Sequence, residues 1–125
     1  MMRSMIRMEL TWIRQWDNTD DIVSWVDVAK LDRAWRADGA YYIAAEKATT
    51  ADRCQKFGRW IKFGHPIWMP HVAFNEGIIS FTDGRHRFAW LRDHMVKALP
   101  VTTEGGSAQY IESELGTKSR RSIIG

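Results

Sequence analysis

Residues 68–103 constrain the fold most, because extended and helical patterns follow one another there with no long linker. Strands are predicted for WMPHVAF (68–74), IISF (78–81) and LPVTT (99–103). NEG at 75–77 is typical of a tight turn in which Gly77 takes a positive φ. Between the second and third strands, residues 85–95 predict a helix whose apolar positions recur at i, i+3 and i+7, namely Phe88, Leu91 and Met95.

Weaker patterns precede this segment. They predict strands over 5–13, from Ile22 to about Val28 and over 40–45, a loop over 16–21, and a short helix from Leu31 to Trp35. We expect that helix to stop at Asp38-Gly39, with Gly39 as a left-handed terminator.

Two further helices are predicted. The first runs from Thr49 or Thr50 to about Phe63, with one apolar face formed by Cys54, Phe57 and Ile61. The second is a short amphipathic helix over 107–116. Residues 117–125 have no periodicity, so we expect a flexible tail or a segment that packs on a partner.

The length of 125 residues argues for one domain, 1–125, with its core in about 22–103. A single cysteine excludes an internal disulfide and suits a reducing cytosol. Four charged residues interrupt the first 16 positions, which argues against a signal peptide and against a membrane span there. We therefore expect a cytoplasmic protein; its oligomeric state is left open.

Positive charge is concentrated in the middle of the chain. Residues 53–97 contain eight cationic and three anionic side chains, a balance of +5, and arginine outnumbers lysine by twelve to six overall. Four cations recur every three residues along the predicted helix before Phe63: Arg53, Lys56, Arg59 and Lys62. They form either a solvated surface or an electropositive wall beside an anion site.

The segment DGRHR at 83–87 breaks a local rule. Asp83 is suited to cap the following helix, and Gly84 allows close backbone approach. Arg85, His86 and Arg87 then place positive charge at the positive end of a helix dipole, where each cation costs about 0.3–1 kcal/mol. A phosphate bound there would offset this cost, because helix amides and arginines both donate to it. The alternatives are a solvated surface or a salt bridge to a nearby aspartate.

The run IISFTDGRHRFAWLRDHMVKALPV (78–101) resembles the ParB/sulfiredoxin-like superfamily, and within it the plasmid fertility inhibition factor family, which includes the oncogenic suppression protein. The similarity extends over roughly residues 22–103. It implies an α+β fold, a small mixed sheet with helices packed around it. It also implies that the turn before the helix binds phosphates of a nucleotide or of DNA.

The resemblance has limits at particular residues. Gly84, His86 and Arg87 match the sulfiredoxin signature, but Arg85 replaces its catalytic cysteine, so sulfiredoxin chemistry is excluded. Arg85 also stands where ParB proteins have an acidic residue, which argues against CTP hydrolysis. Met95 stands where the family pattern tends to have glycine.

The candidate residues fall into three sets. The phosphate or nucleotide set is Gly84, Arg85, His86, Arg87, Arg59, Lys62 and Trp68, and the catalytic set is Asp83, His86 and Arg87. Weaker metal candidates are Glu76, Asp83 and His71, which could hold Mg²⁺ on phosphate oxygens. Most of the seven tryptophans are expected in the core, while Trp60 and Trp68 could stack on a base.

Two functions are consistent with these features. In the first, the DGRHR turn binds ATP, another nucleotide with Mg²⁺, or DNA, with weak NTPase or nuclease activity, and the protein interferes with conjugative transfer. In the second, the chain is a catalytically inert protein that blocks a coupling or secretion component of conjugation. The second rests on family resemblance alone.

Overall fold

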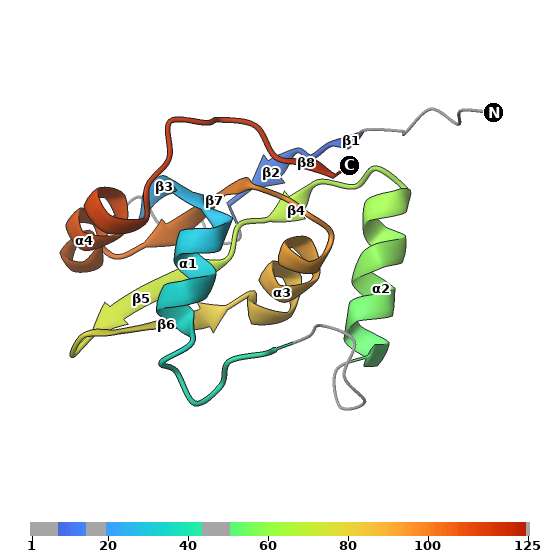
Figure 1. Ribbon diagram of the computed structural model, residues 1–125. Coiled ribbons are helices and arrows are strands. Elements are labelled where there is room, and N and C mark those ends of the chain that lie inside the picture. Colours follow the sequence, from blue (N-terminus) through green and yellow to red (C-terminus); the bar gives the residue numbers. More distant parts are fainter. Residues whose placement is uncertain (1–7, 15–19, 44–50, 125) are drawn as a thin grey trace.

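The structure, a computed structural model, describes residues 8–14, 20–43 and 51–124, and has an α+β fold as expected (Figure 1). Its helices are α1 (Val28–Trp35), α2 (Ala51–Lys62), α3 (Arg85–Asp93) and α4 (Gly105–Leu115). Its strands are β1 (Met8–Glu9), β2 (Trp12–Ile13), β3 (Ile22–Asp27), β4 (Ile67–Trp68), β5 (His71–Asn75), β6 (Ile78–Asp83), β7 (Ala98–Thr103) and β8 (Ile123–Ile124).

The main sheet has four strands in the order β3-β7-β5-β6. β7 pairs antiparallel with β3 and parallel with β5, and β5 pairs antiparallel with β6, so the sheet is mixed. All six residues of β7 are buried, as expected for a central strand. The two short pairs β1-β8 and β2-β4 lie outside this sheet.

The helices divide between two regions of the molecule (Figure 1). α1 and α4 contact each other and the main sheet, α4 through β3 and β5 and α1 through β3 and β6. α3 contacts α1 on one side and α2 on the other. Among the described residues, no helix is long and apolar enough to span a lipid bilayer.

The expectation that most tryptophans lie in the core is wrong, because only two of the six that the structure describes are buried. Trp35 is fully buried, and its ring makes edge contacts with Tyr41, Tyr42, Phe81 and Phe88 at centroid distances of 4.8–5.9 Å. Trp90 is also buried, whereas Trp60 and Trp68 are about half exposed.

The core includes Leu10, Ile111 and Leu115, so it extends beyond residues 22–103 at both ends.

The segment around α1 differs from the prediction. α1 begins at Val28, where the Asp27 side chain accepts a hydrogen bond from the Lys30 amide, and it ends at Trp35. Gly39 has no positive φ, so the predicted left-handed terminator is wrong. Residues 40–43 are not a strand, and 44–45 lie outside the described residues. This segment instead packs on Trp35 through Tyr41 and Tyr42.

Two predicted strands are interrupted. In MIRMELTWI, β1 and β2 are separated at residues 10–11, where Leu10 N–H donates to Ser122 O and Thr11 O accepts from Ile67 N–H. In WMPHVAF, Met69-Pro70 separates β4 from β5. Residues 5–7, 16–19 and the expected start of the second helix at 49–50 lie outside the described residues.

The tight turn at 75–77 is confirmed. Glu76 and Gly77 have φ values of 53° and 80°, and Asn75 pairs with Ile78 directly across the hairpin. Two consecutive positive φ angles are the geometry that best fits the twist of paired strands.

α3 ends more sharply than predicted. Met95, expected on the apolar face of this helix, is 62% exposed and has a φ of 68°. The Met95 N–H donates to Arg92 O and the Val96 N–H donates to Leu91 O, the bond pattern of a Schellman motif. Met95 therefore occupies the left-handed position that glycine usually fills, at the site where the family pattern has glycine.

Residues 117–124 do not form the flexible tail that we expected. Gly116 bridges Val26, Thr117 N–H donates to Trp25 O, and β8 pairs with β1. Ser122 is fully buried, and its hydroxyl donates to Ala98 O at 2.6 Å while accepting from Trp12 Nε1. The segment without periodicity is held by long-range polar contacts, which a periodicity search does not detect.

Candidate functional site

The DGRHR turn joins the end of β6 to the start of α3. Gly84 is the N-cap residue with a φ of 90°, and its carbonyl accepts the first helical hydrogen bond, from Phe88 N–H. Asp83 makes no capping bond, so the predicted cap is wrong. Its carboxylate instead accepts from Arg87 Nη2 at 2.9 Å.

Gly84 is required by packing as well as by its φ. A Cβ atom at this position would lie 2.9 Å from both Cα and Cβ of Pro70, and 2.8 Å from Arg87 Nη2. The close approach predicted for Gly84 is therefore an approach to Pro70, the residue just before β5.

Arg87 fixes the turn to the neighbouring strand. Its Nε donates to Trp68 O at 3.2 Å, while Nη2 pairs with Asp83, and the side chain is only 20% exposed. The guanidinium therefore joins β4, β6 and α3. For Arg87 the structure thus shows the alternative reading of the motif, a salt bridge to a nearby aspartate, and adds a contact with Trp68 that the sequence did not indicate.

Arg85 and His86 meet a residue that the sequence analysis missed. The Tyr42 hydroxyl lies 2.9 Å from His86 Nε2 and accepts from Arg85 Nε at 3.1 Å. The Arg85 guanidinium also lies over the Tyr42 ring, 5.8 Å from its centroid. No local motif around Tyr42 predicts this contact, which spans more than 40 residues of sequence.

The surroundings of His86 favour its neutral form. Partial burial lowers the pKa of His86 below its usual value, and the positive charges of Arg53, Arg85 and Arg87 lower it further. The imidazole is therefore neutral at physiological pH, and its Nε2 can accept the proton of the Tyr42 hydroxyl in their hydrogen bond. Arg53, from the basic helix α2, therefore contributes to the positive electrostatic potential at His86.

Arg92 holds the backbone on which Tyr42 lies. It donates to Tyr42 O at 2.6 Å and to Ile43 O at 3.1 Å, and it pairs with the buried Asp32 at 2.9 Å. Asp32 also accepts from the Tyr41 hydroxyl at 3.1 Å. This network joins α1, α3 and residues 41–43, and so fixes the position of the Tyr42 side chain.

An apolar hollow of about 330 Å³ lies next to the turn. Its lining combines aromatic rings of α2 and β4 with two cations, and consists of Lys56, Phe57, Trp60, Pro66, Ile67, Trp68 and Arg87. Trp60 is held by a hydrogen bond from Nε1 to Pro66 O at 2.9 Å. Trp60 and Trp68, the two tryptophans singled out for base stacking, thus line one hollow together with Arg87.

Arg59 and Lys62 lie elsewhere. They line a separate hollow of about 290 Å³ between α2 and α3, together with Cys54, Trp90 and His94. The structure therefore does not group them with Arg85 and Arg87. Of the four cations along α2, Arg53 and Lys56 are the ones that contribute to the turn and its hollow.

The three metal candidates are not brought together. His71 and Asp83 are paired across β5 and β6, but Glu76 lies in the turn at the other end of that hairpin. His71 is buried, with Nδ1 2.9 Å from Thr102 Oγ1. Among the described residues, no three His, Cys, Asp or Glu side chains form a group that could hold a metal ion.

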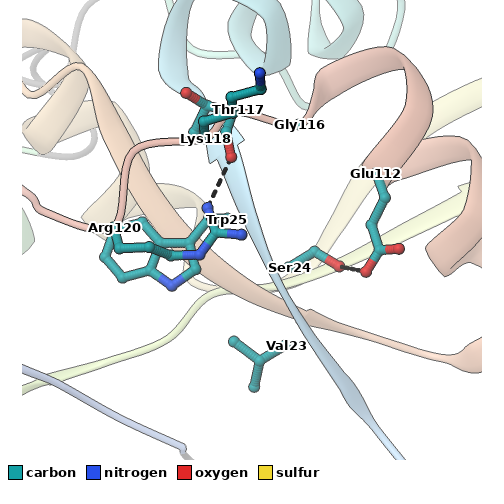
Figure 2. Close-up of a pocket in the computed structure, with 8 residues that line it drawn as sticks. All are labelled: Val23, Ser24, Trp25, Glu112, Gly116, Thr117, Lys118 and Arg120. Carbon is teal, nitrogen blue, oxygen red and sulfur yellow. Dashed lines mark hydrogen bonds between the residues drawn. The ribbon is translucent and has the colours of Figure 1, made fainter.

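A further hollow, of about 490 Å³, lies at the opposite edge of the sheet, along β3 (Figure 2). Ser24 donates to Glu112 at 2.9 Å on one side, and Arg120 donates to Thr117 O at 2.8 Å on the other. Lys118 also lines it. Because charges of both signs line this hollow, it has less anion-binding character than the DGRHR turn.

The fold described above is also that of a solved structure. This is the crystal structure of Oncogenic Suppression Activity Protein, described as a plasmid fertility inhibition factor. It matches with a TM-score of 0.71 and 20% sequence identity, covering 94% of this chain and 71% of that one. At this identity the likeness shows the fold alone.

A family model adds a likeness in sequence. Residues 65–116, from just before β4 to the end of α4, match the family model described as Plasmid Fertility inhibition factor. The resemblance indicated by the DGRHR segment is therefore confirmed: the chain is similar to this family in sequence over residues 65–116 and in fold over most of its length. No curated protein matches the sequence.

Proposed function

We propose that the protein binds phosphate groups of a nucleotide or of DNA at the DGRHR turn, and that it interferes with conjugative DNA transfer. One observation carries the binding proposal: Arg87 belongs both to the turn and to the aromatic hollow beside it. A phosphate at the start of α3 and a base between Trp60 and Trp68 could then be held at the same time.

Local chemistry supports an anion at this place. The first amides of a helix point out of its N-terminus and carry partial positive charge, and Arg85 adds a full charge with planar donors. Arg53 and Lys56 add positive charge from α2. The phosphate set is thus Gly84, Arg85, His86 and Arg87, with Lys56 in place of Arg59 and Lys62.

Weak ATPase or DNase activity is part of this proposal. His86, neutral at physiological pH, would act as the general base, and Arg85 and Arg87 would stabilise the charge of the reacting phosphate. Mg²⁺ would enter with the nucleotide, and Asp83 is the carboxylate of the turn that it would meet. Interference with conjugation rests on the family resemblance and is associational.

Binding is tested by fluorescence anisotropy with a labelled single-stranded oligonucleotide, followed by competition with ATP. Arg85→Ala should weaken binding about tenfold or more, the loss of one charge-assisted contact. Arg120→Ala, which removes the same charge at the opposite sheet edge, is the matched control and should bind like the wild type. Equal affinities for the Arg85 and Arg120 variants would contradict the proposal.

A second candidate function, binding to a protein of the transfer apparatus, has its own observation. Phe63 is 76% exposed and lies beside His65, whose ring contacts Trp60, and the exposed Ile13 is paired with Trp68. This aromatic surface is bordered by Lys56 and Lys62, which favours an acidic partner. Phe63→Ser should then relieve inhibition in a mating assay while leaving oligonucleotide binding intact.

A further inference from the structure

We propose that Tyr42 is a nucleophile that attacks a DNA phosphate at the DGRHR turn, so that the protein nicks DNA through a covalent phosphotyrosyl bond. This inference rests on the proposed binding of DNA phosphate at the turn, and it goes beyond that binding by assigning the attacking atom.

The geometry of Tyr42 is that of an activated nucleophile. Its hydroxyl oxygen lies 2.9 Å from His86 Nε2, within the range in which a base removes a proton from a nucleophile. The Arg85 Nε, 3.1 Å away on the same oxygen, would stabilise the negative charge that develops as the proton leaves. Nucleophile, base and charge-stabilising donor therefore meet at one oxygen atom.

The contact with His86 also favours tyrosine over water as the attacking group. A neutral imidazole has one acceptor nitrogen. The Nε2 atom accepts from the Tyr42 O–H in the tautomer that carries its ring proton on Nδ1, and the proposed mechanism requires this tautomer. In that tautomer the acceptor nitrogen lies on the Tyr42 hydroxyl and not on a water molecule.

Both side chains are held in position by the fold. His86 lies in the first turn of α3, and the backbone carbonyl of Tyr42 accepts a hydrogen bond from the partly buried Arg92. The Tyr42 ring contacts Trp35, at a centroid distance of 5.9 Å, and His86, at 5.0 Å. Arg85 is exposed and Tyr42 is half-buried, so the guanidinium that contacts the hydroxyl faces solvent, where a phosphate would first meet it.

The reaction is a transesterification. The Tyr42 oxygen forms a bond to phosphorus, and the bond from phosphorus to one ester oxygen of the DNA strand breaks. The phenolic proton passes to His86 Nε2 and then to the departing alkoxide, which leaves as a hydroxyl group. One phosphodiester replaces another, so no oxidant, reductant or water is consumed.

The test uses the full chain and single-stranded oligonucleotides with a fluorophore at either the 5′ or the 3′ end. Reactions are stopped with SDS and analysed on denaturing gels, where a covalent adduct is a fluorescent band at the protein's position. The labelled end that stays with the protein identifies the bond that breaks. Anisotropy with the same oligonucleotides measures binding separately.

Tyr42→Phe is the decisive variant, because it keeps the ring contacts with Trp35 and His86 and removes the attacking oxygen alone. It should bind the oligonucleotide with nearly wild-type affinity and form no adduct. Tyr110→Phe is the matched control, because Tyr110 lies in α4, away from the turn, with its ring stacked on Phe74 at a centroid distance of 3.8 Å. This variant should form the adduct like the wild type. His86→Asn should reduce the rate of adduct formation about 10²–10⁴-fold, the usual contribution of a general base.

The outcomes separate this inference from the proposed function. Binding without an adduct, cleavage without an adduct, or an adduct that persists in Tyr42→Phe would each overturn the role of Tyr42 while leaving phosphate binding intact. Absence of oligonucleotide binding would instead contradict the proposed function and, with it, this inference.

Discussion

Replacement of Gly84 by alanine separates two reasons for a glycine at the centre of the motif. The φ of 90° is strained for any residue with a Cβ, at a cost of about 1–2 kcal/mol. The added methyl group would also lie 2.9 Å from two atoms of Pro70, which is buried just before β5 and cannot move freely. Overpacking of this kind costs about a further 1–3 kcal/mol. Gly84→Ala should therefore lower the free energy of unfolding by about 2–5 kcal/mol.

Two other glycines provide the controls. Gly64 and Gly77 have φ values of 75° and 80°, and a Cβ on either would meet nothing within 4 Å. Gly64→Ala and Gly77→Ala should therefore show only the backbone cost of about 1–2 kcal/mol. Urea unfolding of the three variants at one pH measures the differences. If Gly84→Ala is no more destabilising than the controls, the contact with Pro70 does not explain this glycine.

Three further predictions follow from contacts described above. Met95→Gly should stabilise the protein by about 1 kcal/mol in urea unfolding, because it removes the strain of a left-handed backbone at an exposed position. An equal gain for Met95→Ala, which keeps a Cβ atom, would contradict this reason. Ser122→Ala should destabilise by about 1–3 kcal/mol, since Trp12 N–H and Ala98 O lose their buried partner; the exposed Ser119→Ala is the control. Because the pKa of His86 is lowered in the folded state, stability should fall as pH drops below about 6.5, and His86→Asn should flatten this dependence in unfolding curves. An unchanged slope in that variant would exclude His86 as its source.

The elements that the sequence predicted well are those with local causes. The Asn75-Glu76-Gly77 turn, the apolar face of α2 and the strand–turn–helix order around DGRHR all depend on residues within one or two turns of each other. The confirmed α+β class and the family resemblance rest largely on this segment. Local patterns were less reliable at Gly39 and at residues 40–43, where burial of Tyr41 and Tyr42 against Trp35 replaced the expected strand.

The candidate site was predicted only in part, because most of the hydrogen bonds that its side chains make are long range. The sequence indicated Arg85, His86 and Arg87 as neighbours in a helix turn, and the tryptophans as candidates for stacking. It gave no reason to join Tyr42 to His86, or to separate Lys56 from Arg59, since both depend on how α2 and residues 41–43 pack against α3. Spacing along one helix does not specify which of its faces meets which neighbour.

The repulsion between positive charges and the helix dipole at the start of α3 is smaller in the structure than the sequence suggested, and the two arginines contribute to it differently. Arg87 is paired with Asp83 and His86 favours its neutral form, so Arg85 is the cation of the turn without a carboxylate partner among the described residues. Arg85→Ala removes an unfavourable dipole interaction together with one exposed hydrogen bond and ring contact, so stability should change by less than about 0.5 kcal/mol. Arg87→Ala leaves Asp83 and Trp68 O without their donor and should cost about 1.5–3 kcal/mol. Thermal and urea unfolding measured beside oligonucleotide anisotropy should therefore show Arg85→Ala losing affinity alone and Arg87→Ala losing affinity and stability together. Equal stability losses in the two variants would refute this division between an arginine that only binds ligand and one that binds ligand and also supports the fold.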